Sequence, residues 1–143
     1  MKRFLRIVSF ILVFSLILAV PAFAAEVGLS RSLFFARTSQ YIDVDGKNLE
    51  IWFDVTGVEI MDTLGADIVK VQRSADGETW TTVATYDSDD YPEMLRSNTC
   101  IHASYLTYTA SSGYRYRARV VFYAKKGQNI GGVSQYTSSV SIP

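Results

Sequence analysis

From residue 25 to the end of the chain, hydrophobic and polar residues alternate with a period of two, in short runs separated by turn residues. This alternation, with many β-branched and aromatic residues, is typical of strands that bury one side. Helical periodicity is hard to find there. We expect strands at 29–37, 40–44, 48–58, 66–73, 79–86, 99–108, 114–124 and 133–142. The pattern predicts an all-β domain.

Turn residues support these strand boundaries. Asp45-Gly46 separates two alternating runs, and Ser74-Ala75-Asp76-Gly77 joins two further runs in the manner of a hairpin. Glycine accepts the positive φ angles that such turns require. The longest polar connections are Glu59–Gly65 and Asp87–Leu95, and either has room for a short helical turn.

The alternation also assigns side chains to faces, because successive side chains of a strand point to opposite sides. Leu49, Ile51, Phe53 and Val55 share the side that we expect to be buried, and Trp52 lies on the other. In the run 114–124 the aromatic and aliphatic residues share one side and three arginines share the other. We predict one contiguous core between two antiparallel sheets, formed by Ile51, Phe53, Val71, Tyr116, Val120, Phe122 and Val140.

The first 24 residues have the features of a secretory signal peptide. Three basic residues, Lys2, Arg3 and Arg6, precede an apolar run of 14 residues, 7–20. The segment Ala22-Phe23-Ala24 has the small-x-small pattern of a cleavage site. We expect cleavage after Ala24, which divides the chain into a signal peptide, 1–24, and one domain, 25–143. The alternative is a retained anchor, but 14 residues fall short of the roughly 20 that span a bilayer. The prediction is a secreted, extracellular protein with no stable membrane span after cleavage.

The charge of the domain argues against one class of partner, nucleic acids. The domain 25–143 carries 11 basic and 14 acidic residues, a formal charge of −3, whereas a nucleic-acid-binding domain is normally strongly basic. We therefore expect no nucleic-acid partner. Cys100 is the only cysteine, so no intramolecular disulfide can form, and we expect Cys100 to be a small buried hydrophobic residue.

The last third of the chain resembles the end of a fibronectin type III domain. The resemblance rests on Tyr116-x-x-Arg119-Val120, a hairpin at Gly131-Gly132 and the alternating run 134–142; the hairpin 71–83 is similar to the middle hairpin of bacterial members. It implies an antiparallel β-sandwich of seven to eight strands, immunoglobulin or fibronectin III-like. It also implies that Tyr116 is a corner tyrosine whose hydroxyl bonds to upstream backbone. Phe53 stands where the family has a core tryptophan, which leaves another immunoglobulin-like sandwich open.

The whole chain also resembles small secreted proteins of Gram-positive bacteria that carry no assigned activity. The segments that carry this resemblance are 102–109 and 112–114, together with the signal peptide. It implies export from a single-membrane cell and implies no reaction.

Candidate catalytic and metal-binding residues are few. His102 is the only histidine, so a catalytic triad would have to include it, and with Cys100 it falls short of an ordinary zinc site. The acidic residues Asp87, Asp89, Asp90 and Glu93 could contribute to a calcium site, although acidic loops are usually only solvated and the spacing fits no EF-hand. We predict no catalytic residue, no cofactor and no metal site.

The most suggestive candidate site is a row of arginines. Arg115, Arg117 and Arg119 are expected to point outward from one strand, about 7 Å apart. The fibronectin-like arrangement that the resemblance implies places Lys70 on the neighbouring strand. Guanidinium groups bind phosphate and carboxylate in pairs of hydrogen bonds. The alternative is ordinary cross-strand pairing with Glu78 or stacking on tyrosine. The exposed aromatics form a second candidate, a platform for sugar or protein: Trp52, Trp80, Tyr86, Tyr91 and Tyr123.

Together these observations predict a non-catalytic extracellular binding or interaction module. Its partner would be a cell-wall polymer, a glycan or a protein. A passive structural component of the cell envelope and a hydrolase built on His102 are the alternatives.

Overall fold

The computed structural model describes residues 33–143, and they form an all-β fold of seven strands. Residues 1–32, with the predicted signal peptide and the start of the first predicted strand, lie outside the described part. The strands are β1 (Phe35–Asp45), β2 (Asn48–Ser74), β3 (Thr81–Asp87), β4 (Leu95–Thr109), β5 (Tyr114–Lys126), β6 (Asn129–Tyr136) and β7 (Val140–Ile142). A three-residue 3-10 helix, η1 (Pro92–Met94), precedes β4.

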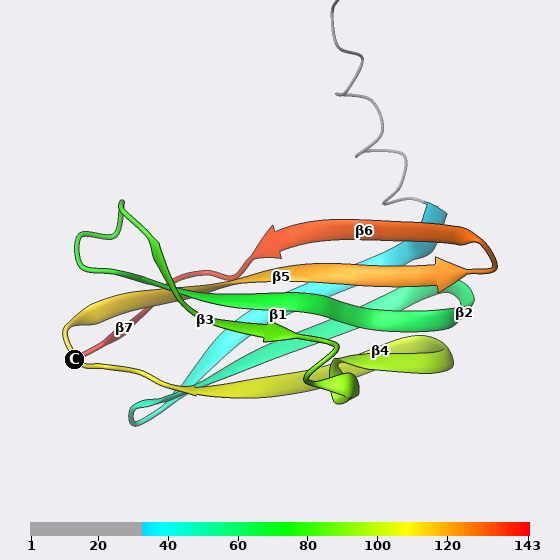
Figure 1. Ribbon diagram of the computed structural model, residues 1–143. Coiled ribbons are helices and arrows are strands. Elements are labelled where there is room, and N and C mark those ends of the chain that lie inside the picture. Colours follow the sequence, from blue (N-terminus) through cyan, green and yellow to red (C-terminus); the bar gives the residue numbers. More distant parts are fainter. Residues whose placement is uncertain (1–32) are drawn as a thin grey trace, which may run out of the picture.

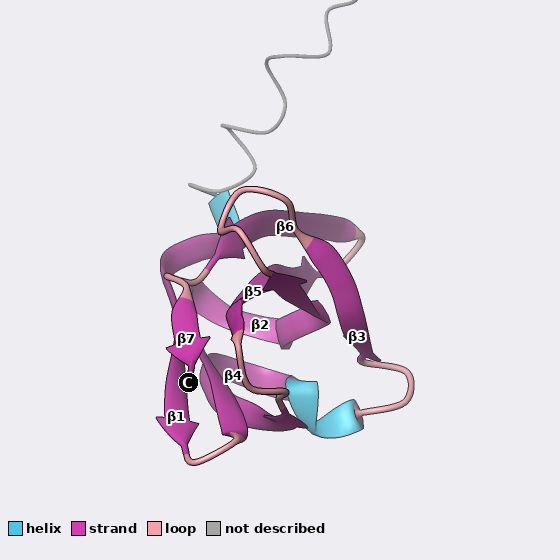
Figure 2. Cartoon of the chain, turned by 90° about the vertical axis from the view of Figure 1, so that its left-hand side faces the viewer, coloured by secondary structure: helices cyan, strands magenta, loops and turns pink. Residues whose placement is uncertain are grey.

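All pairings are antiparallel, and the seven strands form one curled sheet (Figures 1 and 2). Its organising element is β2, which has 27 residues and pairs with four other strands. The first part of β2, 48–56, lies between β1 and β4. The second part, 68–73, lies between β3 and β5, and β5 pairs in turn with β6 and β7. We call these two regions the β1–β2–β4 half and the β3–β2–β5–β6 half.

The two halves join where β2 changes its pairing register between Thr56 and Met61. The prediction of a polar connection at Glu59–Gly65 was wrong, because β2 continues through it. The physical reason is that Met61 and Leu64 are buried and the backbone of 63–65 pairs with both β4 and β5. Glu59 and Asp62 remain exposed, which accounts for the polar appearance of this segment.

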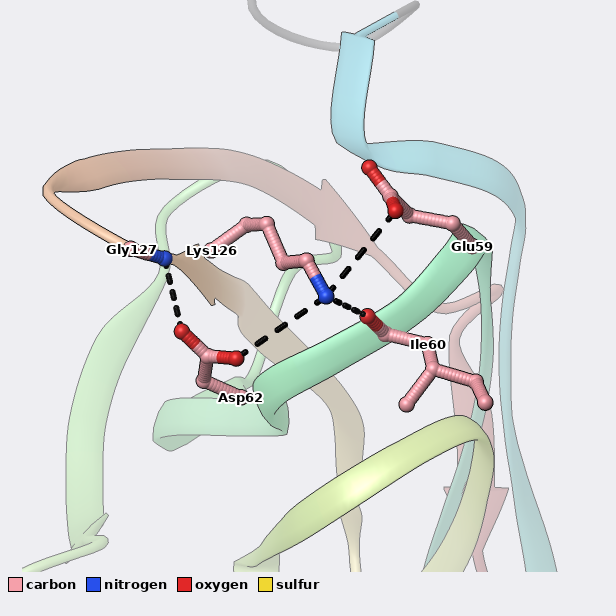
Figure 3. Close-up of polar contacts among 5 residues, drawn as sticks. All are labelled: Glu59, Ile60, Asp62, Lys126 and Gly127. Atoms are coloured by element: carbon pink, nitrogen blue, oxygen red, sulfur yellow. Dashed lines mark hydrogen bonds and ion pairs between the residues drawn. The ribbon is translucent and has the colours of Figure 1, made fainter.

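The turn between β5 and β6 fixes this join (Figure 3). Lys126 Nζ donates to the Ile60 carbonyl at 2.6 Å and lies 3.9 Å from carboxylate oxygens of both Glu59 and Asp62. The backbone N–H of Gly127 donates to the other Asp62 oxygen at 2.6 Å. The ammonium thus makes one hydrogen bond and two longer ion pairs with the bend of β2, and these contacts hold the β5–β6 turn against it.

The core lies inside the curl and draws on both halves. Six of the seven predicted core residues are buried, and Val140 is partly buried against the same cluster. The predicted faces are confirmed: Leu49, Ile51, Phe53 and Val55 point inward, and the arginines of β5 point away from the core. At about 1.5 to 3 kcal/mol for each fully buried large side chain, this cluster is the main source of stability.

Several local predictions are confirmed. The turn at Asp45-Gly46 joins β1 to β2, and the segment 74–80 joins β2 to β3, with Gly46 and Gly77 at φ values of 61° and 82°. The connection 87–95 contains η1. The Tyr116 hydroxyl donates to the Ser111 carbonyl at 3.2 Å and accepts the Ser111 N–H at 2.9 Å, as expected of a corner tyrosine.

The predicted final strand, 133–142, is divided into β6 and β7 around Thr137. The Thr137 N–H donates to the Ala118 carbonyl at 2.9 Å, and the Thr137 hydroxyl accepts the Ala118 N–H at 3.0 Å. This side-chain bond replaces one backbone bond of the ladder and interrupts the strand.

Candidate functional site

The predicted basic residues come together on the outer face of the β3–β2–β5–β6 half. Lys70 is the direct cross-strand partner of Arg119, Gln72 that of Arg117, and Ser74 that of Arg115. On the other side of β5, Arg119 is paired with Tyr136 of β6. We call the surface formed by Lys70, Arg115, Arg117 and Arg119 the arginine face.

Arg117 is held between two aromatic rings. Its guanidinium carbon lies 4.3 Å from the ring centre of Trp80 and 4.5 Å from that of Tyr136. Its Nε–H donates to Gln72 Oε1 at 2.8 Å. The cation–π contacts and this bond fix the plane of the guanidinium. Among residues 33–143, Nε is the only side-chain atom of Arg117 that makes a hydrogen bond, so the two Nη groups keep their donors.

Arg119 is oriented in the same way, through an Nε–H bond of 2.7 Å to Ser134 Oγ. Arg117 and Arg119 therefore each use Nε for a hydrogen bond to a neighbouring strand, and each leaves its two Nη groups available. The Nη pair is the part of a guanidinium that binds a carboxylate or phosphate through two parallel bonds.

No carboxylate neutralises the arginine face in the described part of the chain. The ion pairs found there join Arg37 to Asp54 and Lys126 to Glu59 and Asp62. The expected alternative, cross-strand pairing with Glu78, is therefore absent among residues 33–143, whereas stacking on Trp80 and Tyr136 is present. Lys70 directly opposite Arg119 is a like-charge pair, which is unfavourable in a sheet unless an anion lies near.

Trp80 is positioned by the turn that precedes β3. The Asp76 carboxylate accepts the N–H groups of Glu78 and Thr79 and the Ser74 hydroxyl, each at 2.8 Å. These bonds, led by the one from Thr79, hold the pKa of Asp76 well below its usual range. The turn thus carries a fixed carboxylate that shapes the backbone leading to Trp80.

The predicted aromatic platform does not form as one surface. Trp80 belongs to the arginine face, and Tyr86 and Tyr91 meet edge to face at 5.1 Å beside η1. Tyr123 is half-buried on β5. Trp52 instead lies on the β1–β2–β4 half, with two tyrosines that sequence reasoning missed.

Those tyrosines, Tyr41 and Tyr105, are the cross-strand partners of Trp52 on either side. The ring centres lie 6.1 Å apart for Tyr41 and Trp52 and 4.6 Å apart for Trp52 and Tyr105, with interplanar angles of 5° and 24°. Tyr41 is 54% exposed and Tyr105 49%. We call these three residues the aromatic row.

A signal for Tyr41 was present in the sequence. The turn Gly46-Lys47 pairs Asp45 with Asn48, and that register places Tyr41 opposite Trp52. Tyr105 lies on a strand distant in sequence, and no local pattern specifies its partner.

His102 is buried, with 8% exposure, and packs edge-on against the Phe53 ring. Its Nε2 lies 3.0 Å from the Glu93 carbonyl, so in the neutral ring this nitrogen carries the proton and donates. Burial lowers the pKa of His102, partly offset by that carbonyl and reinforced by Arg96. The prediction that Cys100 is buried was wrong, because its side chain is exposed on β4.

The other candidate groups remain apart. Within residues 33–143, no three acidic, histidine or cysteine side chains gather in a way that could hold a metal ion, so Asp87, Asp89 and Asp90 do not form a calcium-type cluster there. The Asp87 carboxylate instead accepts the N–H of Asp89 at 3.0 Å. In the same part of the chain, no helix has the length and apolarity needed to cross a membrane.

Comparisons with known proteins give little guidance. No protein-family model matches the chain, and no curated protein does. Among solved structures, the sporulation control protein Spo0M from Bacillus subtilis is similar over 72% of this chain, with 10% sequence identity and a TM-score of 0.44. The matched part amounts to 48% of that protein, so the chain spans about half its length.

Proposed function

We propose that this protein is a secreted, non-catalytic binding module that captures an anionic polymer on the arginine face. The polymer class is one with regularly spaced phosphates or carboxylates, such as an anionic cell-wall polymer or an acidic glycan. The observation that carries the proposal is the state of Arg117 and Arg119: both are oriented through Nε, and neither has a carboxylate partner among residues 33–143.

Charge distribution supports an anionic ligand. The domain 25–143 is net acidic, so four basic residues on one face are a local exception rather than part of a uniformly basic surface. Attraction to such a face is mainly electrostatic, each contact is weak, and salt screens it over a Debye length of about 8 to 10 Å. A polymer compensates for weak single contacts by binding several of these residues at once.

The environment of His102 supports a non-catalytic role. A hydrolytic triad requires the histidine to accept a proton from a nucleophile. Here the ring is buried, and its Nε2 faces a backbone carbonyl. A passive structural protein remains the alternative that the binding experiment below addresses.

We further propose that the fold is a divergent immunoglobulin or fibronectin III-like sandwich. The corner bond of Tyr116 and the pairing of the arginine strand with the Lys70 strand and the final strands support this assignment. The continuous β2, which belongs to both halves of one curled sheet, is the principal departure.

The direct test replaces Arg115, Arg117 and Arg119 with glutamine and measures binding to a purified anionic wall polymer at low and moderate salt. The matched control replaces three basic residues elsewhere, Lys47, Arg96 and Lys125, which are exposed and have no ion-pair partner among residues 33–143. Both variants lose the same formal charge.

We expect the arginine variant to lose most of its binding and the control to keep most of it, and wild-type binding to weaken as salt rises. Equal losses in the two variants would show that only net charge matters. No binding by the wild-type protein would favour the passive structural role. Because Arg117 also packs on Trp80, Lys70→Gln serves as a second variant that leaves this stack untouched.

A further inference from the structure

A shallow trough crosses the outer face of the β1–β2–β4 half, beside the aromatic row. The next cross-strand row, Ser39–Asp54–Ala103, carries short side chains, in contrast to the three large rings. A depression results, lined by Tyr41 and Trp52 on one side and by Arg37, Ser39, Asp54 and Ala103 on the other. It lies far in sequence from the arginine face and shares no residue with it.

The polar lining of the trough contains an ion pair. Arg37 Nη2 donates to Asp54 Oδ1 at 2.8 Å, with the arginine side chain mostly exposed and the aspartate side chain about one third exposed. Each partner keeps further hydrogen-bonding capacity, because a guanidinium has five donors and a carboxylate accepts about four bonds. A donor group and an acceptor group therefore stand side by side next to an aromatic wall.

The charge of the trough differs from that of the arginine face. Arg37 and Asp54 neutralise each other, and within residues 33–143 the one other charged group bonded to the aromatic row is Glu50, which accepts the Trp52 Nε1–H at 3.1 Å. No uncompensated cation lines the depression among the described residues. The trough therefore offers no cation that would attract an anionic ligand, and its lining suits an uncharged ligand.

We propose that the trough binds an uncharged oligosaccharide. A sugar ring has an apolar face of C–H groups that packs against aromatic rings, and an edge of hydroxyls that both donate and accept hydrogen bonds. The apolar C–H face matches Tyr41 and Trp52, and the hydroxyl edge matches the Arg37–Asp54 pair. Aromatic side chains together with a few polar groups are typical of ligand sites. A chain of sugars would extend across the strands toward Tyr105.

The two tryptophans of the chain provide separate reporters, since Trp52 lies in the trough and Trp80 on the arginine face. The purified protein is first applied to an array of neutral oligosaccharides of hexoses and N-acetylhexosamines. The strongest binder is then titrated into Trp80→Phe, which keeps Trp52, and into Trp52→Phe, which keeps Trp80, with tryptophan fluorescence as the signal.

We expect saturable quenching or a blue shift in Trp80→Phe and no change in Trp52→Phe. Asp54→Ala and Arg37→Ala should each weaken binding about ten-fold or more, because each removes a hydrogen bond between a charged group and a hydroxyl. Thr85→Ala, an exposed position on β3, is the matched control and should bind as wild type does.

The result separates this site from the arginine face. Replacing Arg115, Arg117 and Arg119 with glutamine, or raising the salt concentration, should leave oligosaccharide binding unchanged. An array with no neutral binder would overturn the proposal and leave the aromatic row as a structural feature of the sheet. So would a ligand-induced signal that comes from Trp80 alone. Neither outcome bears on anionic-polymer binding.

Discussion

The outer faces of the two halves carry the same arrangement of planar groups with a different residue at its centre. On the β1–β2–β4 half, Trp52 lies between Tyr41 and Tyr105; on the β3–β2–β5–β6 half, Arg117 lies between Trp80 and Tyr136. A central indole makes a neutral apolar surface, and a central guanidinium makes a cationic one with free donors. In both stacks the neighbouring strands supply the flanking rings, and the central residue sets the charge of the surface.

Gly65 lies at the join between the two halves, where it pairs with both β4 and β5. A Cβ atom at this position would overlap the Met94 carbonyl and press on the Leu95 backbone, and Gly65 also has a φ of 158°. We expect Gly65→Ala to lower the free energy of unfolding by about 3 kcal/mol or more, since backbone atoms cannot move aside as a side chain can. Urea denaturation measures this loss.

The appropriate control is an alanine at Gly113, which also has positive φ, 81°, but has open space around the added Cβ. It should cost only the backbone strain, about 1 kcal/mol. Equal losses at the two glycines would mean that the close approach of β2 to β4 is not what makes Gly65 necessary.

The central residues of the two stacks should differ in what they contribute to stability. Trp52→Ala removes a large half-buried side chain and two ring contacts, and we expect a loss of about 2 kcal/mol. Arg117→Ala removes two cation–π contacts and one hydrogen bond, and we expect about 1 kcal/mol. Chemical denaturation at two salt concentrations tests both, with only the arginine variant changing the salt dependence.

A reversed order, with Arg117 contributing more than Trp52, would contradict this part of the comparison. It would show that the arginine is mainly a structural residue. The case for an anion-binding role would then be weaker, because packing alone would account for its position.

The connection between β4 and β5, one from each half, is tested by Tyr116→Phe. The variant keeps the buried ring but leaves the Ser111 N–H and carbonyl without the hydroxyl. We expect a loss of about 1 kcal/mol, the usual net value of a hydrogen bond. Thermal or urea unfolding measures it. A loss below about 0.3 kcal/mol would mean that water replaces the hydroxyl at the 110–113 connection.

Local patterns predicted the all-β class and the buried faces, because inward residues such as Phe53 and Val120 follow the period of two that a half-buried strand imposes. They failed at Glu59–Gly65, where exposed acids interrupt the alternation although β2 continues and its residues 63–65 are paired on both sides. They also failed at Cys100. The side chain there follows a register shift that depends on the long-range pairing of β4 with β2.

The arginine face and the aromatic row were likewise predictable only in part. Outward alternation alone was enough to place Arg117 and Arg119 together, and the fibronectin-like arrangement implied by the resemblance placed Lys70 on the neighbouring strand. The environment of Arg117 includes Trp80, and the aromatic row includes Tyr105; both of these residues are distant in sequence from the residue on which they stack. Sequence patterns therefore predicted which residues share a strand face, and the sheet topology was needed to show which strands are neighbours.

The smallest expected effect concerns the pH dependence of stability, and it belongs to the β1–β2–β4 half. His102 packs against Phe53 beneath that half, and burial lowers its pKa in the folded protein. The unfolded chain therefore binds a proton at a higher pH, near the ordinary value of 6.5, than the folded protein does. Stability from the neutral ring is complete above pH 6.5 and is lost progressively as the pH falls toward the folded pKa.

We therefore expect the free energy of unfolding to decline between pH 7 and pH 5 in the wild-type protein and to decline less in His102→Gln, whose amide keeps a donor for the Glu93 carbonyl. Urea titrations at matched salt measure the difference. On the other half, Asp76 titrates far below this window because backbone N–H groups hold its charge, so it adds nothing between these pH values. Parallel pH curves for the two proteins would contradict the lowered pKa of His102, and would leave the two halves alike in their response to acid.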